Sequence, residues 1–185
     1  MNGEKARLRK ACRERAALLA KEYRQEADRA IRERLTQSEP WRSAAGIFLY
    51  VSMWAEPDTR ALIGDALRAG KRVYVPLCLP DHVMKAVRIR SLDELRPGVL
   101  GIPEPPPENE TASSGDLDLA VVPCVSASKT GARLGHGAGY YDRFLSAFPC
   151  ETVCLCHERM LSGAIPTDER DVRMDRVLTE TGFYE

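Results

Sequence analysis

The chain has 185 residues, of which 44% are hydrophobic and 29% charged, an ordinary composition for a globular protein. Its 27 basic and 27 acidic residues cancel, which argues against attraction of the whole surface to nucleic acid or anionic membrane and leaves room only for a local basic site. The charged N-terminus has no signal-peptide apolar region, and no apolar run reaches the roughly 18 residues of a membrane span. We expect one cytoplasmic domain over residues 1–185.

The six cysteines form no C-x-x-C pair. Cys154 and Cys156 are separated by one residue, which is too close for ordinary zinc spacing. Four of the six lie in or beside apolar runs, where a free thiol behaves as a small hydrophobic side chain. The pattern predicts reduced, buried cysteines rather than disulfides or a metal centre. Besides Cys154 and Cys156, this prediction covers Cys12, Cys78, Cys124 and Cys150.

The first third of the chain predicts a helix followed by a βαβ unit. Residues 4–36 read as one long helix, because apolar residues recur on one face and neither Gly nor Pro interrupts them. The apolar run 46–51 is typical of a buried strand. Asp58 can cap a following helix that Gly70 ends. Residues 72–79 then predict a second strand, and strand–helix–strand implies a parallel sheet.

The rest of the chain alternates between loops and short regular elements. A third strand is predicted over 84–89, and a long Pro-, Gly- and Ser-rich loop over 96–115. Further strands are predicted over 117–125, 152–157 and 176–184, with a helix over 140–148. The fold class is therefore α/β: a single three-layer Rossmann-like domain with a mostly parallel central sheet and a long N-terminal helix.

The stretch RLGHGAGYYDRFL, residues 133–145, carries three glycines at alternate positions between a strand and a helix. In open α/β sheets, ligands bind beyond the carboxyl ends of the strands. Glycines let backbone N–H groups approach an anion closely, the helix N-terminus adds its dipole, and Arg133 adds a fork of donors. The segment suits a nucleotide phosphate. The alternative is a glycine-rich turn that only packs tightly.

Asp142 follows the glycines directly, where a carboxylate could hold Mg²⁺ against bound phosphates. The alternative role is an N-terminal helix carboxylate favoured by the helix dipole. A metal site needs a second carboxylate, and DVRMDRVLTE near the C-terminus offers Asp171 and Asp175. Spacing alone leaves open which of them comes close.

GARLGHGAGYYDRFL strongly resembles the signature of the 5-formyltetrahydrofolate cyclo-ligase family. Four further blocks resemble family segments in the same order: KARLR (5–9), YVSMWAEPDT (50–59), GIPEP (101–105) and IPTDERDVRMDRVLTE (165–180). The resemblance spans nearly the whole chain. It implies an ATP- and Mg²⁺-dependent conversion of 5-formyltetrahydrofolate to 5,10-methenyltetrahydrofolate, with release of ADP and phosphate.

The resemblance also implies roles for individual residues. Arg133, Tyr140 and Asp142 would be catalytic, and Asp142 and Asp175 would bind the metal. Folate would contact Met53, Glu56 and Asp58, together with residues 136–140. ATP would contact Lys5, Arg9, Arg133, Leu134, Gly135, His136, Gly137, Ala138, Gly139, Tyr140 and Tyr141.

The chain departs from the family pattern at several positions. His136 and Ala138 stand where members vary, and a hydrogen-bonded loop histidine is the alternative to an acid or base at position 136. SASKTG, 126–131, replaces a Phe-Asp of many members, and its Lys129 could contact nucleotide or only solvent. His157 replaces a common Gln.

Two other function classes stay open at this point. One is a folate- or nucleotide-binding regulator that has lost catalysis, which only the altered SASKTG segment favours. The other is RNA binding by the basic N-terminal helix, against which the zero net charge and an aromatic content of 6% both argue. We expect a monomer with small-molecule partners, and neither nucleic acid nor membrane.

Overall fold

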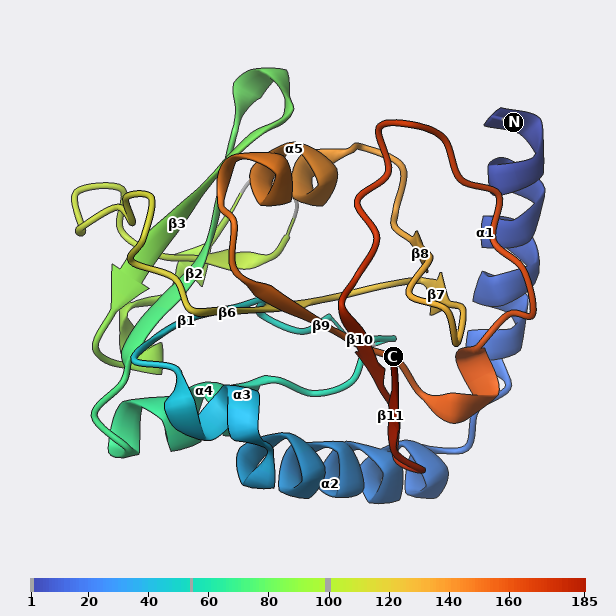
Figure 1. The fold of residues 1–185 in the computed structure, drawn as a ribbon, viewed down its shortest axis with the longest axis horizontal. Coiled ribbons are helices and arrows are strands. Elements are labelled where there is room, and N and C mark those ends of the chain that lie inside the picture. Colours follow the sequence, from blue (N-terminus) through green and yellow to red (C-terminus); the bar gives the residue numbers. More distant parts are fainter. Residues whose placement is uncertain (1, 54, 99–100) are drawn as a thin grey trace.

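The protein folds around a seven-stranded sheet with helices on both faces, giving three layers (Figure 1). The computed structural model describes residues 2–53, 55–98 and 101–185. Across the sheet the order is β11 (Phe183–Tyr184), β10 (Arg176–Leu178), β9 (Glu151–Leu155), β6 (Leu119–Val122), β1 (Gly46–Leu49), β2 (Arg72–Leu79) and β3 (Val83–Ile89). The predicted α/β class and mostly parallel sheet are confirmed, since only the edge strands β11 and β3 pair antiparallel.

The order of the parallel strands defines where a ligand should bind. Taken in chain order, the five parallel strands lie 2-1-3-4-5 across the sheet. This is the flavodoxin-like variant of the doubly wound arrangement, whose switch point lies between the first and third strands. Here these are β1 and β6. Chain paths diverge beyond their carboxyl ends and leave a crevice.

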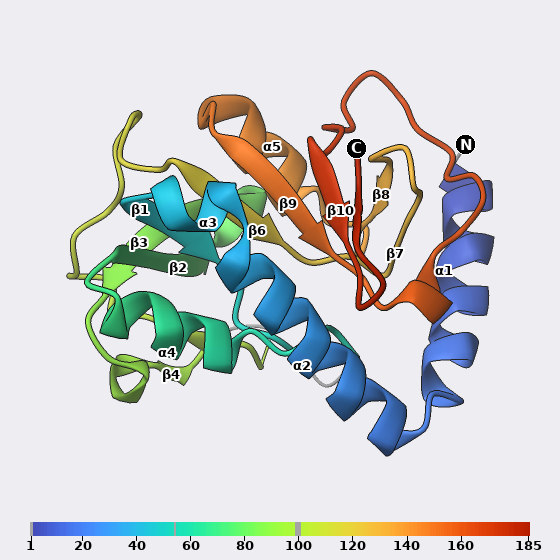
Figure 2. The ribbon, with the colours of Figure 1, turned by 60° about the horizontal axis from the view of Figure 1, so that its bottom comes forward.

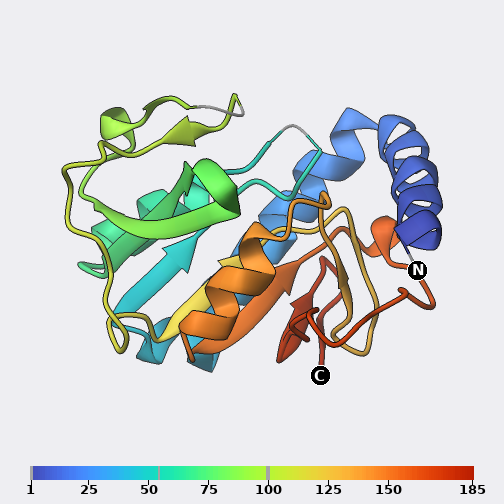
Figure 3. The same cartoon turned by 90° about the horizontal axis from the view of Figure 1, so that it is seen from above.

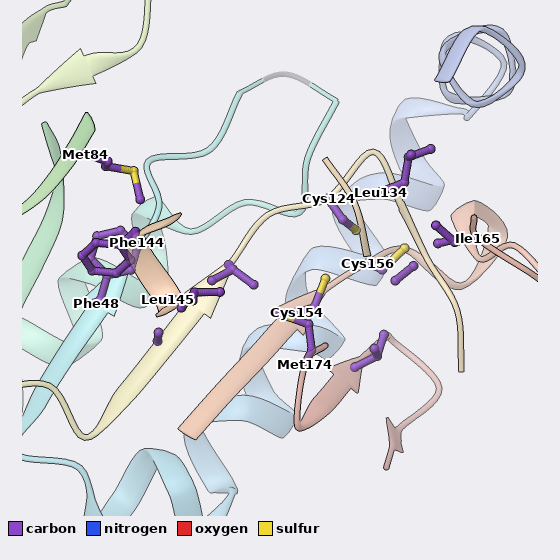
Figure 4. Packing of buried hydrophobic residues seen from close by; sticks show 14 of the residues in the cluster. Phe48, Met84, Cys124, Leu134, Phe144, Leu145, Cys154, Cys156, Ile165 and Met174 are labelled. Atoms are coloured by element: carbon purple, nitrogen blue, oxygen red, sulfur yellow. The ribbon is translucent and has the colours of Figure 1, made fainter. Parts of the chain in front are cut away.

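Alternate strand residues feed two hydrophobic cores, one on each face. Phe48, Tyr74 and Cys154 face a core that α5 (Tyr140–Ala147) covers, and Figure 3 shows this helix lying across the sheet. Figure 4 shows Phe48, Phe144 and Leu145 packed together within it. The opposite core contains Ile47, Leu49, Val73, Val121 and Leu155 beneath α2 (Lys21–Gln37), α3 (Glu39–Ser43) and α4 (Arg60–Arg68).

The single helix predicted over 4–36 is wrong, because two helices occupy this segment. The first, α1 (Asn2–Ala17), places Cys12 in the core on the α5 face, whereas α2 places Ile31 in the opposite core. One straight helix cannot serve both faces. The chain therefore turns at residues 18–20, where Leu18 is 85% exposed, and the two helices run in different directions (Figure 2).

The other predicted elements are found with small changes of extent. β2 has its predicted bounds, and the last predicted strand forms the β10–β11 hairpin. The predicted loop 96–115 contains the pair β4 (Arg96–Pro97) and β5 (Pro103–Glu104). Another short pair, β7 (Ser126–Ala127) and β8 (Arg133–Leu134), was not predicted. The described part of the chain also contains the short 3₁₀ helices η1 (Pro80–His82), η2 (Leu92–Glu94) and η3 (Glu158–Met160).

All six cysteines are free, as predicted. Cys12, Cys124, Cys154 and Cys156 are buried, whereas Cys78 and Cys150 are half-buried. In the described part of the chain, no helix has the length and apolarity to cross a membrane.

Candidate active site

A cavity of about 870 Å³ opens beyond the carboxyl ends of the sheet strands. Val51, after β1, and Pro123, after β6, both line it, so it lies at the switch point of the sheet. Its volume is near the upper end of the range for small-molecule sites. Residues of α1, β2, β3, the loop after β1 and the whole segment 133–142 contribute to its walls.

The β7–β8 hairpin aims the glycine-rich segment into the cavity. Ser126 pairs with Leu134, and Leu134 is buried, which anchors the start of the segment. Gly137 (φ +107°) and Gly139 (φ +72°) then adopt left-handed conformations that other residues avoid. Gly139 directly precedes the first residue of α5. The predicted order of strand, glycine loop and helix is therefore present, with the helix N-terminus behind the loop.

Arg133 is a buried side chain that lines the cavity. Its side chain is only 3% exposed, and Nη2 donates to Asp142 Oδ1 at 2.6 Å. The guanidinium also lies over the Tyr141 ring, 5.7 Å from the centroid. Its buried Nε has no hydrogen-bond partner among the described residues. Arg133 therefore retains donor capacity beside the cavity.

The two N-terminal cations predicted for this site reach it from α1. Arg9 Nε donates to the carbonyl of Gly135 at 2.8 Å. Lys5 Nζ lies 2.5 Å from Asp171 Oδ2 and 3.1 Å from Asp168 Oδ2. Burial by itself would lower the pKa of Lys5, but the hydrogen bonds and charges of the two aspartates outweigh it and raise that pKa. We define Lys5, Arg9 and Arg133 as the basic end of the cavity.

Asp171, rather than Asp175, is the second carboxylate of this region. Asp142 Oδ1 also accepts the Val172 N–H at 3.2 Å, which brings residue 171 alongside, and Asp171 lines the cavity. Asp175 instead accepts the Thr152 N–H and hydroxyl at 2.9 and 2.7 Å. It directly precedes β10, parallel to β9, and so lies at the amino edge of the sheet. The structure therefore does not bring Asp175, predicted as the partner of Asp142 at the metal, to the cavity that Asp142 lines.

Of the three folate-binding residues predicted after β1, two line the cavity and one does not. Met53 and Glu56 line the cavity, and the Met53 N–H donates to Glu56 Oε2 at 2.8 Å. Asp58 is outside the cavity lining, and its Oδ1 accepts the Ser52 hydroxyl at 2.9 Å and the N–H of Arg60, the first residue of α4, at 3.1 Å. Glu56 is 7% exposed, and its Oε1 lies 3.2 Å from His136 Nε2. His136 therefore connects the glycine segment to the loop after β1.

An apolar wall, not identified from the sequence, faces the basic end. It contains Pro76 and Cys78 of β2, Met84 of β3, and Ile102. Burial and the neighbouring Glu104 carboxylate raise the pKa of Cys78 to about 11, so its thiol stays neutral. In the sequence, Pro76 and Cys78 alternate along β2, which indicates that both side chains lie on one face of the sheet. The alternation does not indicate which face of the sheet contacts a ligand.

Tyr140 closes this wall near the glycine segment. Its hydroxyl donates to the Leu79 carbonyl at 3.3 Å, and its ring lies edge-on to His82 at 5.5 Å. Asp81 and His82 form the tip of the β2–β3 hairpin with positive φ values of 58°. The hairpin tip thereby fixes the Tyr140 ring at the cavity wall.

Two further residues singled out in the sequence lie away from the cavity lining. Lys129 lies over the Tyr184 ring at 4.6 Å and 3.7 Å from Glu158. His157 is buried, with Nε2 2.7 Å from Asp28 Oδ1. Both residues therefore have partners within the fold.

The cavity thus combines anion-binding groups, three aspartates (Asp142, Asp168 and Asp171) and an apolar wall. The carboxylates of Asp142 and Asp171 are hard oxygen donors of the kind Mg²⁺ prefers. Within the described residues, no three His, Cys, Asp or Glu side chains are grouped so as to hold a metal ion by themselves. Mg²⁺ commonly binds through one or two carboxylates together with substrate phosphates, and the donor set fits that mode.

Comparisons of the sequence with known proteins all point to one protein family. Residues 1–180 match the 5-formyltetrahydrofolate cyclo-ligase family. A probable 5-formyltetrahydrofolate cyclo-ligase of Caenorhabditis elegans is 33% identical over 95% of this chain and 92% of its own length. The 5-formyltetrahydrofolate cyclo-ligase of Escherichia coli K12 is 30% identical over 94% of this chain and 98% of its own.

A solved structure extends the likeness to three dimensions. The 5,10-methenyltetrahydrofolate synthetase of Aquifex aeolicus superposes with a TM-score of 0.84 at 28% identity, over 97% of this chain and 91% of that one. The sequence matches and the fold lead to one conclusion: this chain belongs to the 5-formyltetrahydrofolate cyclo-ligase family of enzymes.

Proposed function

We propose that the protein converts 5-formyltetrahydrofolate to 5,10-methenyltetrahydrofolate at the expense of ATP, with Mg²⁺ as the metal. One observation carries the proposal: the basic end, three aspartates and a glycine segment meet an apolar wall within a single cavity. A triphosphate is complementary to the basic end, and the ring faces of a folate are complementary to the apolar wall. Family membership supplies the reaction class.

The triphosphate is assigned to the basic end. Arg133 offers a planar fork of donors next to the glycine segment, and Arg9 and Lys5 add charge from α1. Backbone N–H groups between Gly135 and Gly139 and the N-terminus of α5 support the same polarity. These groups would hold the phosphates and neutralise charge as it shifts during transfer.

The folate is assigned to the apolar wall and the loop after β1. Pro76, Met84 and Met53 offer apolar contact, and the Tyr140 ring offers a face or edge for a planar group. Glu56 is the buried hydrogen-bond acceptor on that side. Asp58 is left out of this assignment because it does not line the cavity and is hydrogen bonded to Ser52 and to the Arg60 N–H.

The chemistry needs little more than positioning. The oxygen of the N5-formyl group is a poor leaving group, so it first attacks the γ-phosphorus of ATP, and the bond from that phosphorus to the bridging oxygen breaks to release ADP. N10 then forms a bond to the formyl carbon and loses its proton, and the C–O bond breaks to release phosphate. Arg133 would orient the γ-phosphoryl group, and the apolar wall would limit attack by water on the side that it covers.

The metal is assigned to Asp142 and Asp171, in place of the Asp142–Asp175 pair that the family resemblance implies. When bound there, Mg²⁺ would neutralise phosphate charge. The contribution of the chain is to hold both carboxylates beside the phosphates, Asp142 through Arg133 and the Val172 N–H, and Asp171 through the Asp168 N–H.

The proposal is tested by mixing purified protein, ATP, Mg²⁺ and 5-formyltetrahydrofolate and following the near-ultraviolet absorbance of the methenyl product. We expect a product band that requires all three additions. A folded protein that binds both substrates without turnover would point instead to a regulatory relative without catalysis. A folded protein that binds neither would overturn the assignment of the cavity altogether.

A further inference from the structure

The aspartates at the basic end already have cationic partners within the chain. Asp171 contacts Lys5 at 2.5 Å, and Asp168 contacts the same ammonium at 3.1 Å. Asp142 accepts from Arg133 at 2.6 Å. A metal ion approaching these oxygens therefore competes with protein cations for them. The two cations differ in how readily they can give way.

Arg133 is held rigidly, whereas Lys5 is tethered by a flexible stem. The Arg133 side chain is 3% exposed in β8, and a Cβ built at Gly135 would lie 3.0 Å from its Nη1. Lys5 reaches the aspartates from the first turns of α1 with a single ammonium on four methylenes. Lys5 is thus the group that can exchange the aspartates for another anion.

The carboxylates do not depend on Lys5 for their orientation. The Asp168 N–H donates to Asp171 Oδ2 at 2.7 Å, and the Arg170 N–H donates to Asp168 Oδ1 at 3.0 Å. Removal of the ammonium would leave both aspartates in place and negatively charged. They would then be free to bind a cation.

Burial makes this exchange conditional. The Lys5 side chain is 11% exposed, so its ammonium would be stranded without a counter-anion if a metal ion alone took the aspartates. A polyphosphate at the basic end gives the ammonium a new anionic partner a short distance away. The phosphates therefore release the aspartates for the metal by pairing with the Lys5 ammonium, and the metal releases the ammonium for the phosphates by pairing with the aspartates.

We propose that Lys5 makes metal binding at Asp171 conditional on the nucleotide, by occupying the aspartates until phosphates draw its ammonium away. The inference rests on the proposed function for the identity of the nucleotide. By linkage, the nucleotide and the metal must strengthen each other by the same factor, and Lys5 would set part of that factor.

The direct test is Mn²⁺ binding without nucleotide, followed by the paramagnetic resonance signal of free Mn²⁺. Lys5→Met should bind Mn²⁺ about tenfold more tightly than the wild type, a typical size for coupling between sites. Lys10→Met, a matched change at an exposed position of the same helix, should match the wild type. The double variant Lys5→Met/Asp171→Asn should lose the gain.

A fluorescent ATP analogue, titrated without metal, supplies the second readout. Lys5→Met should bind it about tenfold more weakly, because one phosphate partner is lost. A purely structural lysine would loosen the 168–171 segment and weaken both ligands together. The opposite directions for metal and nucleotide separate the two roles.

The inference is overturned if Lys5→Met, folded by circular dichroism, binds Mn²⁺ no more tightly than the wild type. If that variant does not fold, Lys5→Gln is measured against the same criterion. The Mn²⁺ titration contains neither nucleotide nor folate. A wild type that binds no ATP analogue would therefore overturn the proposed function, while the Mn²⁺ comparison still reports whether Lys5 competes with metal.

Discussion

Asp171 and Asp175 are four residues apart in the chain but face opposite edges of the sheet. Asp175 immediately precedes β10 and is hydrogen bonded to Thr152 at the start of β9. Asp171 lies in the segment that is still at the carboxyl edge after β9, where it meets Lys5, before the chain crosses to the start of β10. Spacing cannot separate these positions, because the direction of β10 decides which carboxylate lies at the edge of the sheet that holds the cavity.

This difference predicts a contrast between three conservative variants. Asp142→Asn and Asp171→Asn should lower turnover by about 100-fold or more, because each removes a charged oxygen donor from the proposed metal site. Asp175→Asn should keep turnover near the wild-type value and lose about 1 kcal/mol of unfolding free energy through weakened bonds from Thr152. Initial rates and urea denaturation measure the two effects. An inactive but folded Asp175→Asn protein would contradict the assignment.

Arg133 gives a second prediction at the residue scale. Arg133→Lys should raise the KM for ATP by about tenfold, because a single ammonium cannot both hold Asp142 and present a fork of donors to phosphate. Arg88→Lys, which changes a surface pair with Glu110, is the matched control and should leave KM unchanged. Equal KM values for the two variants would remove Arg133 from the phosphate site.

At the scale of elements, the glycine segment works because its backbone can take conformations that side chains oppose. Gly137 has φ of +107°, and a Cβ there would lie 3.3 Å from the Arg9 guanidinium. At Gly163, where φ is not positive, an added Cβ would meet no atom within 4 Å. The two glycines therefore form a natural pair for comparison.

Gly137→Ala should weaken binding of an ATP analogue by about tenfold, since the methyl group strains the left-handed backbone and displaces Arg9. Gly163→Ala should leave nucleotide affinity unchanged. Fluorescence titration measures both. Unaltered affinity in Gly137→Ala would indicate that the loop does not need this conformation for its ligand.

The helices and strands also show which parts of the fold could be predicted from sequence patterns. β2 and α4 follow from apolar periodicity and from the cap and stop signals around them. The break between α1 and α2 has no Gly or Pro to signal it, because it arises from packing against opposite faces of the sheet. β7 and β8 have two residues each, too few for any period, although they aim Arg133.

The cavity likewise has a part that was predicted from the sequence and a part that was not. The glycine segment, Lys5, Arg9, Met53 and Glu56 were predicted and meet at one cavity. Their predicted roles remain proposals. The apolar wall could not be predicted, because Pro76 and Met84 become neighbours only through the β2–β3 pairing and look like ordinary strand residues in the sequence.

At the scale of the whole molecule, three half-buried side chains have a raised pKa in the folded state. Burial and the Glu180 carboxylate raise the pKa of Tyr23 to about 12. Burial and Glu104 raise the pKa of Cys78 to about 11, and burial with Asp175 raises that of Cys150 to about 11. The folded state therefore holds these protons at a pH where the unfolded chain has released them.

Stability should consequently be full below about pH 8.5, where unfolded cysteines begin to ionise, and should fall progressively towards about pH 11 and above. Urea denaturation across this range measures the trend. Tyr23→Phe, which removes one of the late-titrating groups, should flatten the decline above about pH 10. A wild-type profile that stays flat to about pH 11 would contradict the role given to these groups.

The whole fold serves to bring two different walls to one switch point. β1 and β6 deliver the loop after β1 and the β7–β8 hairpin to the same crevice, β2 and β3 supply the apolar wall, and α1 adds cations. The proposed reaction requires such proximity, because the formyl oxygen must meet the γ-phosphorus of ATP directly.

The transfer of that oxygen is the most direct measurement of the central claim. 5-Formyltetrahydrofolate labelled with ¹⁸O in its formyl group is incubated with the protein, Mg²⁺ and unlabelled ATP, and the released phosphate is analysed by mass spectrometry. The proposed chemistry predicts one ¹⁸O atom in each phosphate released with methenyl product. Product formation with unlabelled phosphate would contradict phosphorylation of the formyl oxygen.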